Sequence, residues 1–187
     1  LAGFTILSMI FSIFTIIISL DLPRDHLTLI ISLAISVSVF LFFNFPFGKI
    51  FLGDSGAYWL GWLIGIIVIN IYSNNSLNTW GAVIILFYPS MEVIFSTFRK
   101  IFSHKSPFEA DLQHLHLKLY FKIKGPVERS NIFNSFTTIC LMPLWITSPL
   151  LIIWSQYDSN LNYLFLTLLI ILYFTYYKFV PSLSSDK

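Results

Sequence analysis

Residues 27–43 read LTLIISLAISVSVFLFF, an apolar stretch without a charged side chain. A helix needs about 20 such residues to cross about 30 Å of hydrocarbon, and the tolerated range is about 17 to 25. The pattern recurs along the chain. Stretches that qualify or nearly qualify as spans are residues 4–20, 27–43, 57–72, 79–98, 131–154 and 160–180. The sequence therefore predicts an all-α integral membrane protein, a polytopic bundle of about six transmembrane helices.

The composition excludes a water-soluble globule. Of the 187 residues, 56% are hydrophobic and 11% are charged, against about 25% charged in an ordinary soluble domain. A net charge of +2 is too small to indicate a nucleic-acid partner. Cys140 is the only cysteine, which excludes an intrachain disulfide and a cysteine-based metal site. We expect residues 1–187 to form a single membrane domain in contact with membrane lipid.

Basic residues concentrate in one long connection, residues 99–130, which holds seven of the 11 lysines and arginines. Alternation of six spans places Lys49, Lys178 and Lys187 on the same side and leaves Arg24 on the other. Since cytoplasmic loops are enriched in Lys and Arg, we expect this basic loop to be cytoplasmic.

Two segments break the simple pattern. Pro89 and Glu92 interrupt residues 79–98, and proline removes a backbone donor that another group must replace. We therefore expect the second half of that stretch to enter a watery or protein-lined cavity. Residues 115–124 alternate apolar and mostly polar side chains, which predicts a short strand or hairpin at the interface, with an irregular loop as the alternative.

Asp54 lies between Gly53 and Gly56, just before the third span. Glycine lets backbone approach a ligand closely, and a carboxylate there could hold Mg²⁺, which prefers oxygen ligands and bridges to substrate phosphates. Capping of the following helix by Asp54 or Ser55 is an equal alternative. Gly61 and Gly65, four residues apart within the span, predict a helix-packing face.

Residues 88, 92, 95, 96 and 99 share one helical stripe, so Glu92 and Arg99 can lie on one face. An intramembrane carboxylate is a functional candidate, but we expect a structural ion pair of Glu92 with Arg99 or a nearby lysine. His114 and His116 point apart on a regular strand or helix and converge only in an irregular loop. With basic neighbours they suit a phosphate or pyrophosphate, although such a loop more often contacts anionic lipid.

Two motifs in order carry a resemblance. They are Asn44-x-Pro46-x-x-Lys49-Ile50-Phe51-Leu52-Gly53-Asp54-Ser55-Gly56, then Tyr88-Pro89, Glu92, Phe95-Ser96, Arg99-Lys100, Ser106-Pro107, Asp111 and His114-Leu115-His116. The chain resembles, up to about residue 125, the polyprenyl-phosphate N-acetylhexosamine-1-phosphate transferases (glycosyltransferase family 4). That family includes the phospho-N-acetylmuramoyl-pentapeptide translocase of bacterial cell-wall synthesis.

The resemblance implies transfer of a sugar 1-phosphate from a UDP-N-acetylhexosamine to polyprenyl phosphate, releasing UMP, with Mg²⁺ as cofactor. It implies a bacterial inner-membrane enzyme that initiates a lipid-linked envelope glycan. It leaves open whether the protein forms a homodimer. The implied roles are Asp54 as the Mg²⁺ ligand, Phe51 stacked on uracil, Asn44 and Gly53 beside the substrate, His114 and His116 in the pyrophosphate loop, and Arg99 and Asp111 supporting that loop.

The chain departs from the family in several places. Many members have aspartate in place of Glu92 and a further histidine in place of Leu117, which suggests a subgroup resembling enzymes that start O-antigen or other surface glycans. Two family motifs, an adjacent aspartate pair and an Asp-Gly rich motif, do not occur. We therefore expect the C-terminal half of an enzyme of about ten spans, inactive by itself. A transporter subunit and a non-catalytic remnant are the alternatives.

Overall fold

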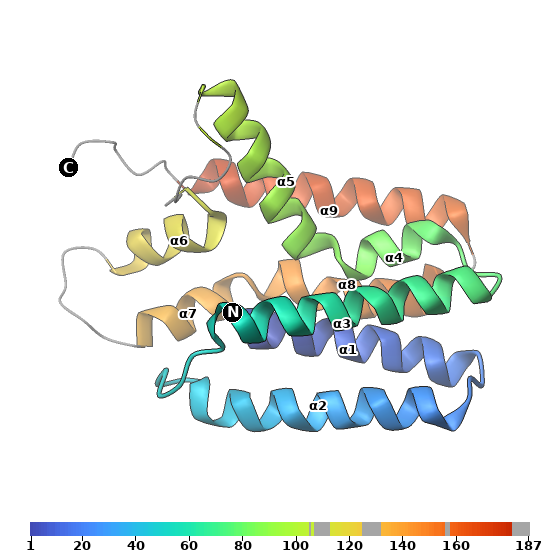
Figure 1. Ribbon diagram of the computed structural model, residues 1–187. Helices are drawn as coiled ribbons and strands as arrows, with labels where there is room; N and C mark the ends of the chain where they lie inside the picture. The colour runs from blue at the N-terminus through green and yellow to red at the C-terminus, as the bar shows by residue number, and fades with distance from the viewer. Residues whose placement is uncertain (105, 107–112, 125–131, 156–157, 181–187) are drawn as a thin grey trace.

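The computed structural model describes residues 1–104, 106, 113–124, 132–155 and 158–180. Within these residues the chain is helical and contains no strand (Figure 1). The helices are α1 (Ala2–Ser19), α2 (Arg24–Asn44), α3 (Gly53–Asn74), α4 (Thr79–Ile85), α5 (Phe87–Phe102), α6 (Leu115–Lys124), α7 (Ile132–Cys140), α8 (Met142–Ser155) and α9 (Ser159–Phe179).

Four helices, α1, α2, α3 and α9, are each long and apolar enough to cross a membrane. Two further spans are bent pairs, α4 with α5 at 80° and α7 with α8 at 54°. Counting each pair as one span gives six crossings. The prediction of an all-α polytopic membrane protein with about six spans is confirmed.

The break between α4 and α5 falls at Leu86, ahead of Pro89. Pro89 is the third residue of α5, and a first turn tolerates proline because the N–H groups there have no intrahelical partner. The predicted interruption is therefore present. In Figure 1, α5 leaves the direction of the bundle, while its Tyr88, Glu92 and Ser96 are buried against the rest of the protein. One face of the second half of this span is therefore lined by protein, whereas Val93, Ile94 and Phe98 on the other face are exposed.

The strand or hairpin predicted for residues 115–124 is wrong, because this segment forms α6. Its leucines and lysines are good helix formers. The side chains of Leu115 and Lys118 are buried and that of Leu119 packs against a buried cluster, so residues at i, i+3 and i+4 face the protein. Tertiary packing of this helical face prevails over the alternating pattern.

The apolar core has two parts. The first is centred on α1, which packs against α2, α3 and α8 and contributes Ile10, Ile13, Ile16 and Ile17. The second joins α5, α6, α8 and α9, with Leu115, Leu141 and Tyr173 almost fully buried. Large apolar side chains also lie exposed on outward faces of the long helices, for example Phe42, Ile69 and Ile171. Such faces suit contact with lipid.

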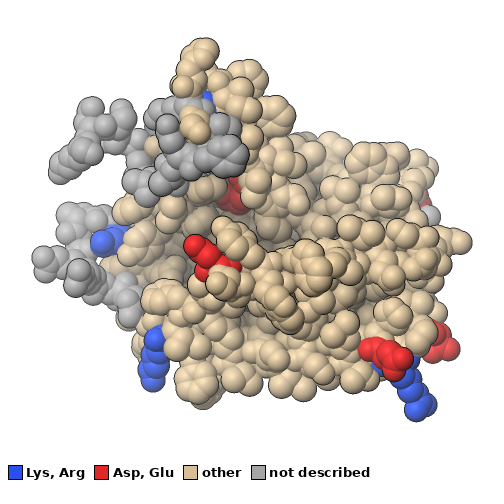
Figure 2. Space-filling view, viewed as in Figure 1, with Lys and Arg blue, Asp and Glu red and all other residues tan. Residues whose placement is uncertain are grey.

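The loops between the helices lie at the two ends of the bundle (Figure 1). The α2–α3 loop, α6 and the end of α9 lie at one end, which we call the loop end. The α1–α2 and α3–α4 turns lie at the other. In Figure 2 the broad surface between the two ends shows no lysine or arginine. This arrangement brings the two sequence motifs to the same end of the molecule.

Candidate functional site

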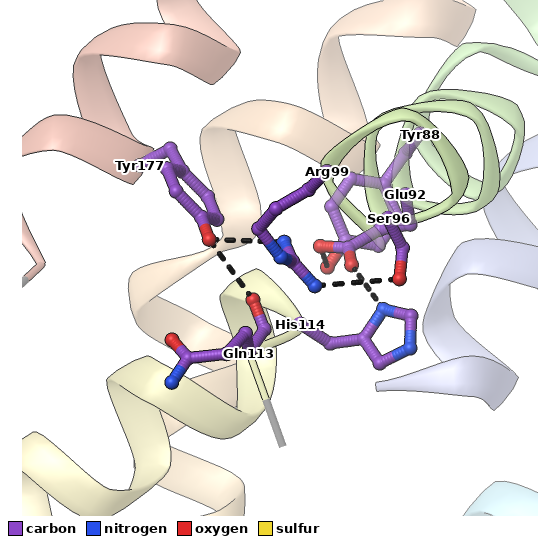
Figure 3. A network of polar contacts seen from close by, with 7 residues as sticks. All are labelled: Tyr88, Glu92, Ser96, Arg99, Gln113, His114 and Tyr177. Atoms are coloured by element: carbon purple, nitrogen blue, oxygen red, sulfur yellow. Dashed lines mark hydrogen bonds and ion pairs between the residues drawn. The ribbon is translucent and has the colours of Figure 1, made fainter. Parts of the chain in front are cut away.

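Glu92 and His114 form an ion pair between α5 and the residue that precedes α6 (Figure 3). His114 Nδ1 lies 3.0 Å from Glu92 Oε2, and the Tyr88 hydroxyl donates to Glu92 Oε1 at 3.3 Å. Glu92 is only 7% exposed. The predicted helical stripe is therefore confirmed, but the expected partner of Glu92 is wrong: His114, and not Arg99, pairs with it. The carboxylate contacts a side chain 22 residues away in sequence, on the residue just before α6.

This geometry fixes how His114 can act. A carboxylate only accepts hydrogen bonds, so Nδ1 of His114 is the donor toward Glu92. Nε2 is then the ring atom left for a ligand, as in sites where a carboxylate orients a histidine from behind. The pair holds the imidazole in one orientation.

His114 and His116 converge, although the segment that follows His114 is the helix α6 and not the irregular loop that we expected this convergence to require. Their rings stack with centroids 5.7 Å apart, because His114 lies just outside α6 and escapes the helical angle between residues two apart. Burial lowers the pKa of His116 from its usual 6.5, and His114 adds to this effect while Glu92 opposes it. His116 is therefore a neutral hydrogen-bonding group at pH 7.

A second set of contacts centres on Tyr177 of α9 (Figure 3). Arg99 donates to the Tyr177 hydroxyl at 3.0 Å and to Ser96 Oγ at 3.3 Å, and the Tyr177 hydroxyl donates to the Gln113 carbonyl at 3.3 Å. Lys118, 3% exposed, places Nζ 3.6 Å from the centre of the Tyr177 ring. Burial and the nearby Arg99 charge lower the pKa of Lys118.

Sequence reasoning missed this use of Tyr177. The residue has the position of an ordinary interfacial aromatic near a span end, and 78 residues separate it from Arg99. No local pattern indicates such a contact. Asp111, the other residue expected to support the loop, lies outside the described residues.

The loop between α2 and α3 presents Phe51. Asn44 donates to the Ile50 carbonyl at 2.6 Å, and Ser135 of α7 donates to the Pro46 carbonyl. Phe51 is 77% exposed and lines a pocket of about 310 Å³ that His116, Tyr120 and Asn134 also line. Phe51 of the first motif and His116 of the second therefore meet at one pocket, while the predicted substrate contacts of Asn44, Phe51 and Gly53 stay predictions.

Asp54 lies in the first turn of α3, directly after Gly53, whose φ of +68° favours glycine. Its carboxylate is exposed, and no side chain among the described residues caps this helix. The predicted capping hydrogen bond is therefore wrong, although a negative charge still suits a helix N-terminus. Asp54 remains the candidate metal ligand.

A cleft of about 570 Å³ runs between α1, α3 and α5, and its walls are mainly apolar. Glu92, His114 and His116 line it together, whereas Ala57, Gly61 and Gly65 form its α3 wall. A Cβ added at Gly61 or Gly65 would meet no described atom within 4 Å, so the predicted packing face is wrong. These three residues follow Asp54 by three, seven and eleven positions. Asp54 thus lies at the loop end of the same helical face.

The side chains near Asp54 can be compared with the ligands that Mg²⁺ requires. The described residues contain no group of three histidine, cysteine or acidic side chains able to hold a metal ion. Mg²⁺ does not need one, because it keeps several waters and usually binds through one or two carboxylates together with substrate phosphates. An exposed Asp54 carboxylate, three residues before Ala57 of the cleft wall, fits that mode of binding.

Comparison with known proteins agrees with the first of the two sequence motifs. Residues 1–72 match the model of glycosyl transferase family 4. An undecaprenyl-phosphate alpha-N-acetylglucosaminyl 1-phosphate transferase of Thermotoga maritima is 34% identical over 85 residues, 46% of this chain and 28% of that protein. A probable undecaprenyl-phosphate N-acetylglucosaminyl 1-phosphate transferase of Bacillus subtilis is 37% identical over 98 residues, 50% of this chain and 27% of that protein.

The matched stretches span just over a quarter of each relative's length. No solved structure matches the chain. The family match covers α1, α2 and most of α3, including the Asp54 motif. Residues 1–72 are therefore similar to glycosyl transferase family 4, and the chain is similar over about half of its length to two transferases of undecaprenyl phosphate.

Proposed function

We propose that this chain is part of an enzyme that transfers an N-acetylhexosamine 1-phosphate from a UDP-sugar to a polyprenyl phosphate. A phosphate oxygen of the acceptor forms a bond to the phosphorus that carries the sugar. The bond from that phosphorus to the bridging oxygen of the pyrophosphate breaks, and UMP leaves with this oxygen. The product is a lipid-linked sugar that begins an envelope glycan.

One observation carries the proposal, namely that an apolar cleft opens beside the Glu92–His114 pair. A polyprenyl phosphate is a long apolar chain with an anionic head. The cleft walls suit the chain, and histidine side chains suit the phosphate. The names of both relatives contain an undecaprenyl phosphate, which supports the same class of acceptor.

The residues of the chain have separate roles in this proposal. Glu92 orients His114, whose Nε2 contacts a phosphate oxygen, and the neutral His116 adds a further hydrogen bond. Phe51, exposed at the neighbouring pocket, stacks on the uracil. Asn44 and Gly53 shape the loop beneath the substrate, while Arg99 and Asp111 support the histidine segment. Such positioning is the main requirement of phosphoryl transfer.

Asp54 would hold Mg²⁺, which neutralises charge on the pyrophosphate when bound. The basic residues near α6 suit the same anionic substrates. By the excess of Lys and Arg, we place the loop end in the cytoplasm and the protein in the inner membrane of a bacterium.

The test uses membranes from cells that express the complete gene. Labelled sugar phosphate from each UDP-N-acetylhexosamine is offered to polyprenyl phosphate with Mg²⁺, for wild type and for Asp54→Asn. We expect labelled lipid from wild type and a loss of about 10²–10³-fold in the variant. Asp25→Asn is the matched control, because Asp25 is also the exposed second residue of a helix, at the opposite end of the bundle.

Equal activity of wild type and Asp54→Asn would reject Asp54 as the ligand. Wild-type protein that is folded in the membrane but makes no labelled lipid with any donor would reject the proposed reaction. Ion flux without dependence on UDP-sugar would then favour a transporter.

A further inference from the structure

The two sets of contacts in Figure 3 meet at the peptide bond between Gln113 and His114. On one side of this bond, the His114 ring reaches Glu92 of α5. On the other side, the Gln113 carbonyl accepts from the Tyr177 hydroxyl of α9. The position of His114 therefore depends on two helices, α5 and α9, and both lie beyond residues 1–72, which the family model matches.

The Tyr177 ring is itself held from several directions. Phe95 of α5 packs its ring against that of Tyr177 edge to face with centroids 4.6 Å apart, and Tyr173 stacks on it one turn earlier in α9. Arg99 lies 5.8 Å from the ring centre and Lys118 lies 3.6 Å from it. A ring packed in this way has one orientation, so its hydroxyl is a fixed point for hydrogen bonds.

The Tyr177 hydroxyl is both a hydrogen-bond acceptor and a hydrogen-bond donor. It accepts from Arg99 at 3.0 Å and donates to Gln113 at 3.3 Å. A phenol has a single hydrogen to donate. With Arg99 as donor on one side, that hydrogen is directed toward the Gln113 carbonyl.

Helix α6 is tied to the same end of α9 by two lysines four residues apart. Lys118 Nζ donates to the Tyr177 carbonyl at 3.4 Å, and Lys122 Nζ donates to the Phe179 carbonyl at 3.1 Å. The last carbonyls of a helix have no intrahelical donor, and lysine side chains satisfy them well. The α6 segment is therefore joined to α9 at three places, namely the Gln113 carbonyl and the side chains of Lys118 and Lys122.

We propose that Tyr177 is a positioning residue, which fixes the Gln113–His114 segment against α9 so that His114 stays paired with Glu92 and stacked on His116. Its relevance to catalysis rests on the function proposed above. Tyr177 touches neither substrate in this proposal and acts only through the histidines. Helix α9 thereby becomes part of the machinery that forms the site.

The first arm of the test compares kinetics of Tyr177→Phe with Tyr176→Phe. The first variant keeps the ring and loses both hydroxyl contacts. The second removes a hydroxyl that forms no hydrogen bond to another described residue and lies next in sequence. We expect kcat to fall about tenfold in Tyr177→Phe, as for loss of one or two hydrogen bonds, with KM for both substrates within about twofold. Tyr176→Phe should match wild type.

The second arm needs no activity. Spin labels at Phe121→Cys on α6 and Ile171→Cys on α9, both exposed, report the distance between the helices in a Cys140→Ser background. We expect one narrow distance distribution with Tyr177 and a broader one with Tyr177→Phe. Lys118→Met, which removes the ammonium that lies over the ring, should broaden it as well.

The two arms separate the possible failures. An unchanged distance distribution in both Tyr177→Phe and Lys118→Met overturns the proposal, whatever the activity. A broader distribution with unchanged kcat overturns the catalytic part, because α6 would then be held for structural reasons alone. If wild type makes no lipid product but the distribution still broadens, the proposed function fails while the positioning of the His114 segment by Tyr177 stands.

Discussion

The α1–α3 bundle and the corner where α5, α6 and α9 meet are stabilised in different ways. The bundle is packed with isoleucines such as Ile13, Ile17 and Ile64. Many of its serines, Ser12 and Ser32 among them, donate to the backbone of their own helix. The corner also buries apolar side chains such as Leu115 and Tyr173, but it adds directional contacts between distant segments. Glu92 pairs with His114, and Tyr177 contacts Arg99 and Gln113.

The difference follows from the bilayer. Lipid chains are as apolar as isoleucine, so an isoleucine gains little free energy by moving from lipid to a helix interface. Close packing must therefore supply the free energy of helix association. Polar groups, by contrast, must find a hydrogen-bond partner within the protein, because an unpaired polar group in hydrocarbon costs free energy. The bundle should therefore respond to changes of shape and the corner to changes of charge or hydrogen bonding.

Among the changes that test this contrast between bundle and corner, the largest effect is expected at Glu92. In Glu92→Gln, the amide can present either its oxygen or its NH₂ group to His114 Nδ1. The imidazole is then no longer held in one tautomer. We expect kcat for sugar-phosphate transfer to fall about 100-fold, equal to about 2.7 kcal/mol. Tyr88→Phe, which removes only the 3.3 Å contact to Glu92, should have a smaller effect.

Thr97→Val is the control on the same helix, because the Thr97 hydroxyl has no hydrogen-bond partner among the described residues. It should keep wild-type kinetics. A Glu92→Gln enzyme as active as Thr97→Val would show that the carboxylate charge does not act on the site, and the contrast between corner and bundle would lose its chemical basis.

The same contrast explains what the sequence could predict. The spans follow from local hydropathy, and the shared face of Tyr88, Glu92 and Arg99 follows from helical spacing alone. The partners of that face could not be predicted, because His114 and Tyr177 are distant in sequence. Helix α6 was predicted as a strand because its alternating pattern carries no information about the face that packs against α7 and the end of α9.

The bundle should be sensitive to shape. Ile13→Ala removes a side chain that is 1% exposed at the centre of the first core cluster. We expect the free energy of unfolding to fall by about 2 kcal/mol, which is near the lower end of the losses seen for such truncations in soluble cores. The loss is small because a side chain in a membrane protein gains little free energy by leaving lipid for the core. Thermal unfolding in detergent measures it. Folded Ile13→Ala should keep its kcat.

Ile18→Ala makes the same chemical change on the same helix at a position that is 56% exposed. It should leave the melting temperature nearly unchanged. Equal losses at both positions would mean that the helix itself, and not its packing in the core, governs stability.

The cleft connects the two regions, because its walls belong to the bundle and its polar end to the corner. Gly65→Leu should fill part of it and raise KM for polyprenyl phosphate about tenfold, or about 1.4 kcal/mol. Gly65→Ala should change little, since an added Cβ meets no described atom within 4 Å. Steady-state kinetics with varied acceptor distinguishes the two variants.

Gly81→Ala is the contrasting glycine, where an added Cβ would lie 2.6 Å from the Tyr72 hydroxyl. It should lower stability and leave KM unchanged. An unchanged acceptor KM in Gly65→Leu would remove the cleft from the path of the lipid and would confine the proposed site to the pocket at Phe51 and His116.

The smallest effect is the pH dependence of stability at His116. Burial lowers the pKa of His116 below its usual 6.5, so between those two pKa values the unfolded chain binds a proton that the folded protein does not. Stability from this residue is therefore present above pH 6.5 and declines as the pH falls from 6.5 toward the lowered pKa of the folded protein. His116→Gln cannot titrate, and its melting temperature should fall less than that of wild type over this range. A decline as steep in the variant would place the titrating group elsewhere, and the corner would then owe its acid sensitivity to groups other than this buried imidazole.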